Sequence, residues 1–364
     1  MALVALCYGT RPQIIKASIL RKSLANGHRV RAIDTGQHYD YELNALLYEQ
    51  LGVQVPDEFL YVGSAAHATQ LAAILGGAAA SFQRERPDIV VVIGDTNSTL
   101  GCALAAAQLR IPVVHVEAGL RAVDALMAEE INRRAVDAIA HVLCAPSVAA
   151  AARLARERDD AVIVETGDVA RDVLDGNLAR IPVMGSESPL PTEPFVFATL
   201  HRAELTSSAT CLRRVVDSLA NIGLPVIFPA HPRTRIALQA AGITIPAERV
   251  TLLQPLGYLE TLACVRGASA VVTDSGGIQR EAYWLGTPCI TVRRETEWSE
   301  TVALGANTLC SPSDITDLVS AVNKAVAGPR DWYRDSYGDG TASVRIGAAV
   351  NAFLSEVTPR VEAR

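Results

Sequence analysis

Short apolar runs rich in β-branched residues recur along the whole chain, separated by helix-like stretches. A first set covers 2–8, 29–35, 88–94, 112–116, 141–145 and 162–166, and a second set covers 195–200, 225–230, 250–254, 270–273 and 288–292. Continuous apolar runs of this length are typical of strands that are buried on both faces of a parallel sheet. Their alternation with helices predicts an α/β fold with right-handed crossovers.

The chain has 364 residues, which is long for a single hydrophobic core, so two domains are expected. Residues 181–194 lie between the two sets of strands and contain four prolines, two serines and a glycine, which is typical of a linker. We therefore predict two Rossmann-like, doubly wound domains at 1–170 and 195–342, joined by a linker region at 171–194. The helix-like stretch at 343–358 is expected to return to the first domain.

Charge and motif patterns exclude several classes of function. The net charge of −6 gives no broad basic face, so nucleic acid is not an expected partner. No apolar stretch is long enough for a transmembrane helix, and the N-terminus does not resemble a signal peptide. The scattered cysteines form no CxxC, which fits a reduced, cytoplasmic protein. Zinc spacing, GxGxxG and Walker A motifs are absent, so neither a metal nor a cofactor is predicted.

Polar and reactive residues follow many of the predicted strands. They include Thr10, Arg11, Gln37, His38, Asp95, His115, Glu117, His201, Arg202, His231, Asp274 and Ser275. Ligands of open α/β sheets bind at the carboxyl ends of the strands, so these side chains are candidates for a binding site. The alternative interpretation is that each residue only caps the helix that follows it.

The segment AVVTDSGGIQRE ends an apolar strand in a turn of small residues. A helix N-terminus carries free N–H groups, and Ser275, Gly276 and Gly277 let an anion approach them closely. Glu281 lies one helical turn further on, about 5–6 Å along the axis, roughly the step from a diphosphate to its ribose. The stretch therefore predicts a nucleoside diphosphate site, although a glycine cap with a solvent-facing Glu281 gives the same pattern.

Basic side chains at other strand ends are candidates for contacts with the same phosphates. Arg11 follows the first strand, and Lys16 lies one turn into the predicted helix, although both could simply be surface charges. His201 and His231 follow two strands of the second domain, where His201 would face the diphosphate. A core histidine without a ligand is the alternative for either ring.

Carboxylates gather after two neighbouring strands of the first domain. Asp95 and Glu117 are expected to lie close together at the edge of that sheet, and Glu129 and Glu130 begin the next helix. Neighbouring carboxylates perturb one another's pKa values, as acid–base sites require. Each residue of the glutamate pair also has an arginine four residues on, so ordinary helix ion pairs are the alternative.

Together these segments resemble the UDP-N-acetylglucosamine 2-epimerase family. The matching motifs run in order from about residue 7 to 310 and read GTRPQIIK, TGQHYD, GDTNST, HVEAGLR, EEINR, HRAE, HPRT, PLGYLE and TDSGGIQREAYWLGTPCITVR. Each motif alone is weak, but the ordered set is highly specific. The resemblance implies a GT-B type fold with the active site in the interdomain cleft. It also implies UDP-GlcNAc as substrate, no redox cofactor or metal, and a homodimer.

The resemblance further implies a reaction and its residues. The family eliminates UDP across C1–C2 to give 2-acetamidoglucal, then protonates the opposite face and adds UDP back, which yields UDP-ManNAc. Three carboxylates match its acid–base positions: Asp95, Glu117 and Glu129. His201 matches the histidine beside the diphosphate. The positions that match UDP contacts are Arg11, Ser275, Gly276, Gly277 and Glu281, and Pro255 and Tyr258 would lie near uracil.

The chain departs from the family pattern at several positions. The loop before Glu129 is shorter than in the well-known reversible bacterial epimerases, and Ala128 replaces the usual proline. Gln13 stands where many members have Glu, and Trp298 with Ser299 replaces Arg-Pro. Some reversible members of the family carry an allosteric UDP-GlcNAc site near this loop. The shorter loop of this chain argues against the same site here. The open alternatives are a hydrolysing epimerase that releases ManNAc and UDP, a modified UDP-hexosamine as substrate, a GT-B glycosyltransferase, and a UDP-sugar-binding protein without turnover.

Overall fold

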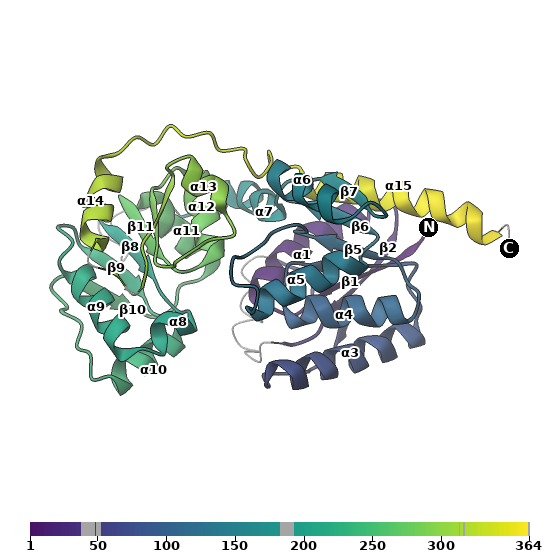
Figure 1. Cartoon of the computed structure of the whole chain (residues 1–364), viewed down its shortest axis with the longest axis horizontal. Coiled ribbons are helices and arrows are strands. Elements are labelled where there is room, and N and C mark those ends of the chain that lie inside the picture. The colour runs from purple at the N-terminus through teal and green to yellow at the C-terminus, as the bar shows by residue number, and fades with distance from the viewer. Residues whose placement is uncertain (38–47, 49–51, 183–192, 313, 316, 363–364) are drawn as a thin grey trace. The chain divides into compact units, whose positions relative to one another are not determined.

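The computed structural model describes residues 1–37, 48, 52–182, 193–312, 314–315 and 317–362. The chain divides into two compact units. The first consists of Met1–Gly176 and Ser336–Arg364, and the second is Asn177–Asp335. Each unit contains its own parallel sheet with helices on both faces (Figure 1).

The sheet of the first unit has seven strands in the order β3-β2-β1-β4-β5-β6-β7. The strands are β1 (Leu3–Tyr8), β2 (Arg29–Asp34), β3 (Glu58–Phe59), β4 (Ile89–Ile93), β5 (Val113–Val116), β6 (Val142–Ala145) and β7 (Val162–Glu165). The helices are α1 (Arg11–Leu24), α3 (His67–Arg84), α4 (Asn97–Gln108), α5 (Ala128–Ile139), α6 (Val148–Glu157), α7 (Val169–Asn177) and α15 (Ala342–Glu362). Alternate strand residues face two cores, one shared with α1 and α15 and the other with α3, α4, α5 and α6.

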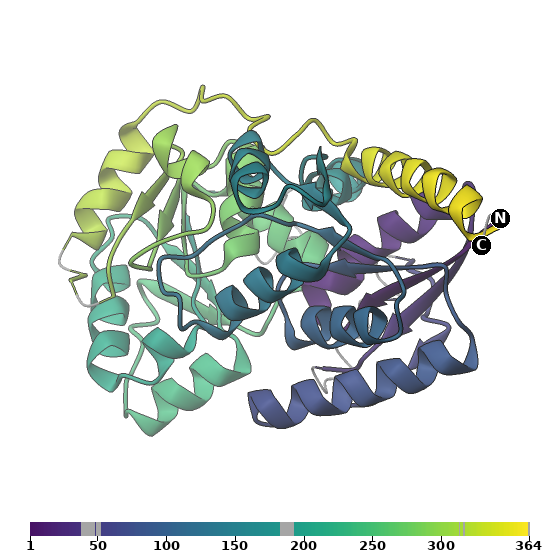
Figure 2. The ribbon, with the colours of Figure 1, turned by 45° about the vertical axis from the view of Figure 1, so that its right-hand side comes forward.

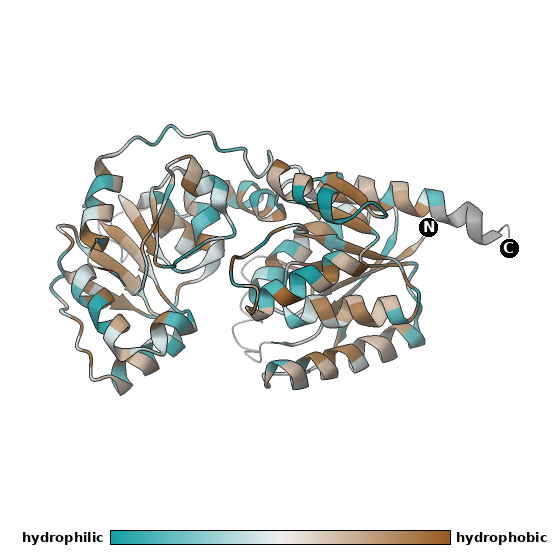
Figure 3. Ribbon diagram, viewed as in Figure 1, coloured by the Kyte–Doolittle hydropathy of each residue, from teal (hydrophilic) through white to brown (hydrophobic). Residues whose placement is uncertain are grey.

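The sheet of the second unit has six strands in the order β10-β9-β8-β11-β12-β13. The strands are β8 (Val196–Thr199), β9 (Val226–Pro229), β10 (Val250–Leu253), β11 (Ala270–Thr273), β12 (Cys289–Thr291) and β13 (Asn307–Leu309). The helices are α8 (Ala203–Thr206), α9 (Ala209–Ala220), α10 (Pro232–Ala240), α11 (Tyr258–Gly267), α12 (Gly276–Leu285), α13 (Ser299–Ala303) and α14 (Leu318–Ala327). Helices α9 and α14 cover one face, and α11 and α12 cover the other. Hydrophobic residues are concentrated on the strands of both sheets (Figure 3).

Strand order reverses once in each sheet. The reversal lies between β1 and β4 in the first unit and between β8 and β11 in the second. Ligands of doubly wound folds bind outside the carboxyl ends of the strands at such reversals. The residues that follow these four strands therefore occupy the positions in which a site is expected.

The predicted α/β fold with two parallel sheets is confirmed, because the predicted strands all pair in parallel within one of the two sheets. Two edge strands were missed by sequence analysis. β3 has only two residues, and β13 reads Asn-Thr-Leu, so neither produces an apolar run. They are held in the sheets by backbone pairing with β2 and β12 rather than by apolar runs of their own.

The beginning of the expected linker is helical. α7 and the 3₁₀-helix η1 (Leu178–Arg180) occupy the beginning of 171–194, and 183–192 lie outside the described residues. The C-terminal helix α15 packs beside α1 in the first unit (Figure 2). Its start is capped by Asp172, which accepts hydrogen bonds from the N–H groups of Ala342 and Ser343 at 3.0 and 2.7 Å.

Within the described part of the chain, no helix is both long and apolar enough to cross a membrane.

Candidate functional site

Glu117 follows β5 and is held beside the ammonium group of Lys16 in α1. Its backbone has a φ of 70°, an uncommon conformation for a residue with a side chain. Both members of the ion pair are buried. Gly94 follows β4 with a φ of 68°, and a Cβ there would lie 3.4 Å from Oε2 of Glu117. Two predicted site residues, Lys16 and Glu117, are thus brought together, in a strained conformation of the kind that clusters at functional sites.

Asp95 follows β4 and is anchored by the helix that starts after β5. Its Oδ2 accepts a hydrogen bond from Nε of Arg133 at 2.9 Å, and about a third of the Asp95 side chain, 32%, remains exposed. Arg133 also donates to the buried Glu130 at 2.9 Å, and Arg134 donates to the other oxygen of Glu130 at 2.8 Å. Arg133 therefore links Asp95 to α5 and neutralises part of its charge.

The two adjacent glutamates at the start of α5 have different environments. Glu130 is fully buried, and besides the two arginines it accepts the N–H of Ala122 at 2.8 Å. Its role is therefore structural. Glu129, the predicted acid–base residue, is exposed in the first turn of the same helix. The ion-pair interpretation thus applies to Glu130, while the Glu129 carboxylate remains accessible to a ligand.

His115 and Asp137 form a fully buried pair beneath these turns. Nδ1 of His115 lies 2.6 Å from Oδ1 of Asp137, and Nε2 lies 2.8 Å from the carbonyl oxygen of Gly94. Both oxygen atoms are acceptors, so each ring nitrogen carries a proton when both bonds are made. Burial favours a raised pKa for Asp137, but His115 and Arg121 outweigh it, and the pKa of this carboxyl is lowered. The pair fixes the turn that carries Asp95.

Gln13 joins the ends of β1 and β4, the two strands at which the order reverses. Its Oε1 accepts the N–H groups of Gly9 and Thr10 at 2.9 and 3.1 Å. Its Nε2 donates to the carbonyl of Ile93 at 2.6 Å and to Oγ1 of Thr96 at 3.0 Å. The amide side chain can bind the N–H groups of one strand end and the oxygens of the other, since it has an acceptor and two donors.

Neither Gln13 nor Asp137 was assigned a function from the sequence. The spacing of Thr10 and Gln13 matches a capping box, which the structure contains, and this local signal could have identified Gln13. Asp137 contacts His115, 22 residues earlier, so no local pattern indicates the pairing. Arg11 is the first residue of α1 and is partly exposed at the same strand end as Gln13.

In the second unit, Asp274 follows β11 and organises the turn after β8. Its Oδ2 accepts the backbone N–H groups of His201 and Arg202, each at 2.8 Å. Its Oδ1 lies 3.3 Å from Nδ1 of His201. The ring of His201 also lies near that of His231, with centroids 5.8 Å apart. The two predicted histidines of this unit are therefore neighbours, and Asp274 joins them as a buried carboxylate.

The small residues after Asp274 form the N-terminus of α12. Ser275 is the N-cap, and its Oγ accepts the N–H of Ile278 at 3.5 Å. Gly276 and Gly277 form the first turn and are partly exposed, as is Glu281 one turn further on. A Cβ on Gly276 would lie 3.1 Å from Nε1 of Trp298, so a larger residue there would require the indole to shift by a few tenths of an ångström. This helix terminus suits an anion.

The remaining predicted residues lie after the edge strand β10. Pro255 is exposed in the loop, and Tyr258 begins α11 after its N-cap, Gly257. β10 is separated from β8 by β9. Among the described residues, no group of three or more His, Cys, Asp or Glu side chains is placed to hold a metal ion.

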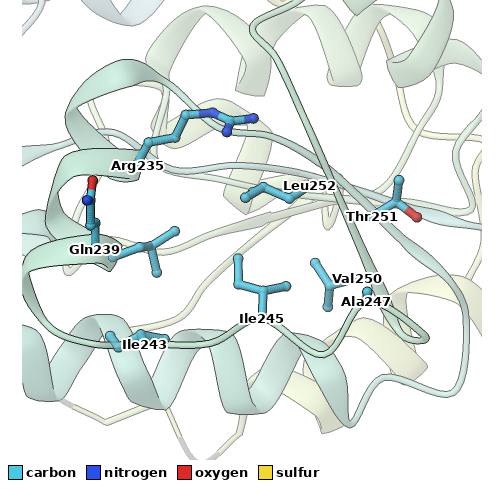
Figure 4. A pocket seen from close by; sticks show the side chains of 9 residues that line it. Arg235, Gln239, Ile243, Ile245, Ala247, Val250, Thr251 and Leu252 are labelled. Atoms are coloured by element: carbon cyan, nitrogen blue, oxygen red, sulfur yellow. The ribbon is translucent and has the colours of Figure 1, made fainter.

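A pocket of about 600 Å³ lies beside β10 and α10 (Figure 4). Its lining is mostly apolar and includes Leu238, Ile243, Ile245 and Val250, with Arg235 at one side. None of the predicted site residues lines it. We therefore place the candidate site at the strand ends rather than in this pocket.

Comparison with known proteins agrees with this arrangement of strands. A model of the UDP-N-acetylglucosamine 2-epimerase family matches residues 22–351. The chain is 36% identical over 347 residues to the UDP-N-acetylglucosamine 2-epimerase homolog of Methanococcus maripaludis, covering 93% of this chain and 96% of that protein. It is 38% identical over 352 residues to the UDP-2,3-diacetamido-2,3-dideoxy-D-glucuronate 2-epimerase of Pseudomonas aeruginosa, with the same coverage.

Solved structures also show a similarity to 2-epimerases of this family. The UDP-GlcNAc 2-epimerase of Methanocaldococcus jannaschii, crystallised with UDP-GlcNAc and UDP, superposes with a TM-score of 0.88 at 34% identity, covering 97% of this chain and all of that one. A calicheamicin glycosyltransferase superposes with a TM-score of 0.56 at 15% identity, which is a likeness of the GT-B fold alone. The chain therefore belongs to the UDP-N-acetylglucosamine 2-epimerase family of nucleotide-sugar 2-epimerases.

Proposed function

We propose that this protein is a UDP-N-acetylglucosamine 2-epimerase that interconverts UDP-GlcNAc and UDP-ManNAc. The observation that carries the proposal is the group of carboxylates at the carboxyl ends of β4 and β5. Glu117 is buried beside Lys16, Asp95 is held by Arg133, and Glu129 is exposed on the next helix. Acidic groups in such different environments can divide the roles of acid and base between them.

The chemistry explains why more than one carboxylate is needed. The C2 proton of UDP-GlcNAc has no adjacent carbonyl, so a stabilised enolate is not accessible. Removal of this proton is instead coupled to cleavage of the C1–O bond to UDP, which forms the C1–C2 double bond of 2-acetamidoglucal. A proton is then delivered to the other face of C2, and the phosphate oxygen of UDP returns to C1. Asp95, Glu117 and Glu129 are proposed as the groups that remove and deliver these protons.

The second unit supplies groups suited to the nucleotide. The N–H groups of Gly276 and Gly277, together with Ser275 at the cap, would bind the diphosphate, and Glu281 would accept hydrogen bonds from the ribose hydroxyls. His201 would stabilise the charge that develops on the departing phosphate oxygen. A donor set fixed before the reaction acts on the transition state without further reorganisation.

A second candidate substrate is UDP-2,3-diacetamido-2,3-dideoxy-D-glucuronate. The observation in its favour is the 38% identity with the epimerase of Pseudomonas aeruginosa that is named for this sugar. The reaction at C1 and C2 would be the same. The two candidates differ in groups at C3 and C6, so a direct comparison of rates separates them.

The experiment that tests the proposal is a proton and phosphorus NMR time course with UDP-GlcNAc in D2O. We expect UDP-ManNAc with deuterium at C2, and a much slower reaction for Glu117→Gln, which has similar shape but no charge. Free UDP with deuterated ManNAc would indicate the hydrolysing reaction. Turnover of the diacetamido sugar alone would favour the second candidate. No deuterium uptake from either sugar would refute epimerisation and leave transfer to an added acceptor as the reaction to test.

A further inference from the structure

Asp274 follows β11, and its carboxylate is hydrogen-bonded to the backbone of the turn after β8. It is 1% exposed, and its Oδ2 accepts two backbone N–H bonds of 2.8 Å from His201 and Arg202. These two donors fix which oxygen faces the backbone. The other oxygen, Oδ1, must then point away from them.

Oδ1 of Asp274 is buried and makes no hydrogen bond within the described residues, although Nδ1 of His201 lies 3.3 Å away. A buried carboxylate oxygen without a donor is costly, so a nearby N–H is strongly favoured as its partner. Hydrogen bonds of this kind are often long in ligand-free enzymes and shorten in the substrate complex. The His201 side chain is 38% exposed, so its other nitrogen, Nε2, remains accessible to a ligand.

His231, the neighbouring ring, has the opposite arrangement. It caps α10, and its Nδ1 accepts the backbone N–H of Arg233 at 3.2 Å. A neutral His231 must therefore carry its proton on Nε2. Two rings with centroids 5.8 Å apart are thus surrounded by groups that favour different tautomers.

We propose that Asp274 is a positioning residue that keeps a proton on Nδ1 of His201 and so leaves Nε2 to act on the diphosphate. This inference rests on the proposed function for its chemical consequence. When the C1–O bond breaks, the electron pair passes to the phosphate oxygen, and a protonated His201 donates a hydrogen bond to it from Nε2. The positive charge of the ring is balanced by Asp274, and no proton has to leave Nδ1.

The test is the proton position on both rings, measured by long-range ¹H–¹⁵N NMR of the ¹⁵N-histidine-labelled full chain at alkaline pH. His201→Gln and His231→Gln provide the assignments. We expect a proton on Nδ1 of His201 and none on Nδ1 of His231. An unprotonated Nδ1 of His201 in the wild-type protein would overturn the inference, whatever the variants show.

Asp274→Asn sharpens the test. The two backbone donors hold the amide oxygen in the place of Oδ2, so the NH2 group faces Nδ1 of His201 and reverses its tautomer, while His231 should be unchanged. We expect kcat to fall by about 10²-fold or more, with UDP affinity within about twofold. A reversed tautomer with unchanged kcat would refute the catalytic consequence. If the wild-type protein fails to turn over UDP-sugars but Nδ1 is protonated, the proposed function fails and the positioning role stands.

Discussion

Lys16 and Glu117 form the buried ion pair in the first unit on which the proposed chemistry most depends. Removal of one partner leaves a buried charge uncompensated, which typically costs about 3–5 kcal/mol. We expect Lys16→Met to lower the free energy of unfolding by about this amount in urea titrations. The double variant Lys16→Met with Glu117→Gln should recover much of the loss, because no isolated charge remains. Additive losses in the double variant would show that the pair does not couple.

Glu281 lies one turn beyond the N-terminus of α12 and is partly exposed. If it binds the ribose hydroxyls, Glu281→Ala should weaken UDP binding by about 1–3 kcal/mol, the scale of a hydrogen bond to a charged group. Calorimetric titration with UDP measures the loss. Glu248→Ala removes an exposed carboxylate elsewhere in the same unit and should leave the affinity unchanged. Equal affinities for the two variants would remove Glu281 from the site.

Asp137 makes the stability of the first unit depend on pH. Burial acts to raise the pKa of this carboxyl, but the charges of His115 and Arg121 lower it overall. A lowered pKa stabilises the folded state above the ordinary value of about 3.9, and this contribution is lost as the pH falls through the lowered pKa. Urea titrations between pH 6 and about 2 should therefore show a shallower loss for Asp137→Asn than for the wild type. Parallel pH profiles would contradict the assignment.

At the scale of elements, most of the fold could be predicted because the central strands are buried on both faces. Runs such as Val4–Leu6 and Ile89–Ile93 face helices on each side, an arrangement that is typical of a parallel sheet. The short strands β3 and β13 could not be predicted in the same way, because they are placed by pairing with β2 and β12. Apolar runs in the sequence reflect burial, and these edge strands have too few buried residues to produce such a run.

Helices α3 and α4 pack closely at Gly101, although alanine has a higher helix propensity than glycine. A Cβ on Gly101 in α4 would lie 2.6 Å from Cγ2 of Ile74 in α3. We expect Gly101→Ala to destabilise the protein by about 1–3 kcal/mol through overpacking, despite the better propensity of alanine. A Cβ on Gly76 in α3 would have no neighbouring atom within 4 Å, so Gly76→Ala should be neutral or stabilising by up to about 1 kcal/mol. Thermal unfolding of both variants measures the contrast, and an equal shift for the two would contradict the packing argument.

At the scale of the whole molecule, the sequence predicted which reactive residues follow the strands but not which of them pair. The strand-end rule locates Asp95, Glu117 and His201 once the order of the strands is known. The partners of these residues lie far along the chain, as with Glu117 and Lys16, 101 residues apart, or His201 and Asp274. Such pairings follow from the register of parallel strands and from helix packing, which local patterns do not record.

The cysteines offer a way to follow each unit separately in the intact chain. Cys144 lies in the first unit, and Cys264 and Cys289 lie in the second. Burial raises the pKa of each of these three thiols to about 12, so they react only when the surrounding core opens. Cys211 is partly exposed and serves as an internal standard for the reagent. Cys264 and Cys289 share a core with Ala282 of α12, the helix that carries the proposed diphosphate site.

We therefore expect UDP to protect Cys264 and Cys289 from alkylation more than Cys144. Binding to the folded state at 100 times the dissociation constant adds about 2.7 kcal/mol, which slows labelling by about 100-fold where reclosing outpaces the reagent. Mass spectrometry of alkylated peptides, with and without UDP, gives the rate at each thiol. Cys211 should react at the same rate in both samples. Labelling of the second unit that UDP leaves unchanged would contradict nucleotide binding at α12, and equal protection of Cys144 would show that the two units open as one.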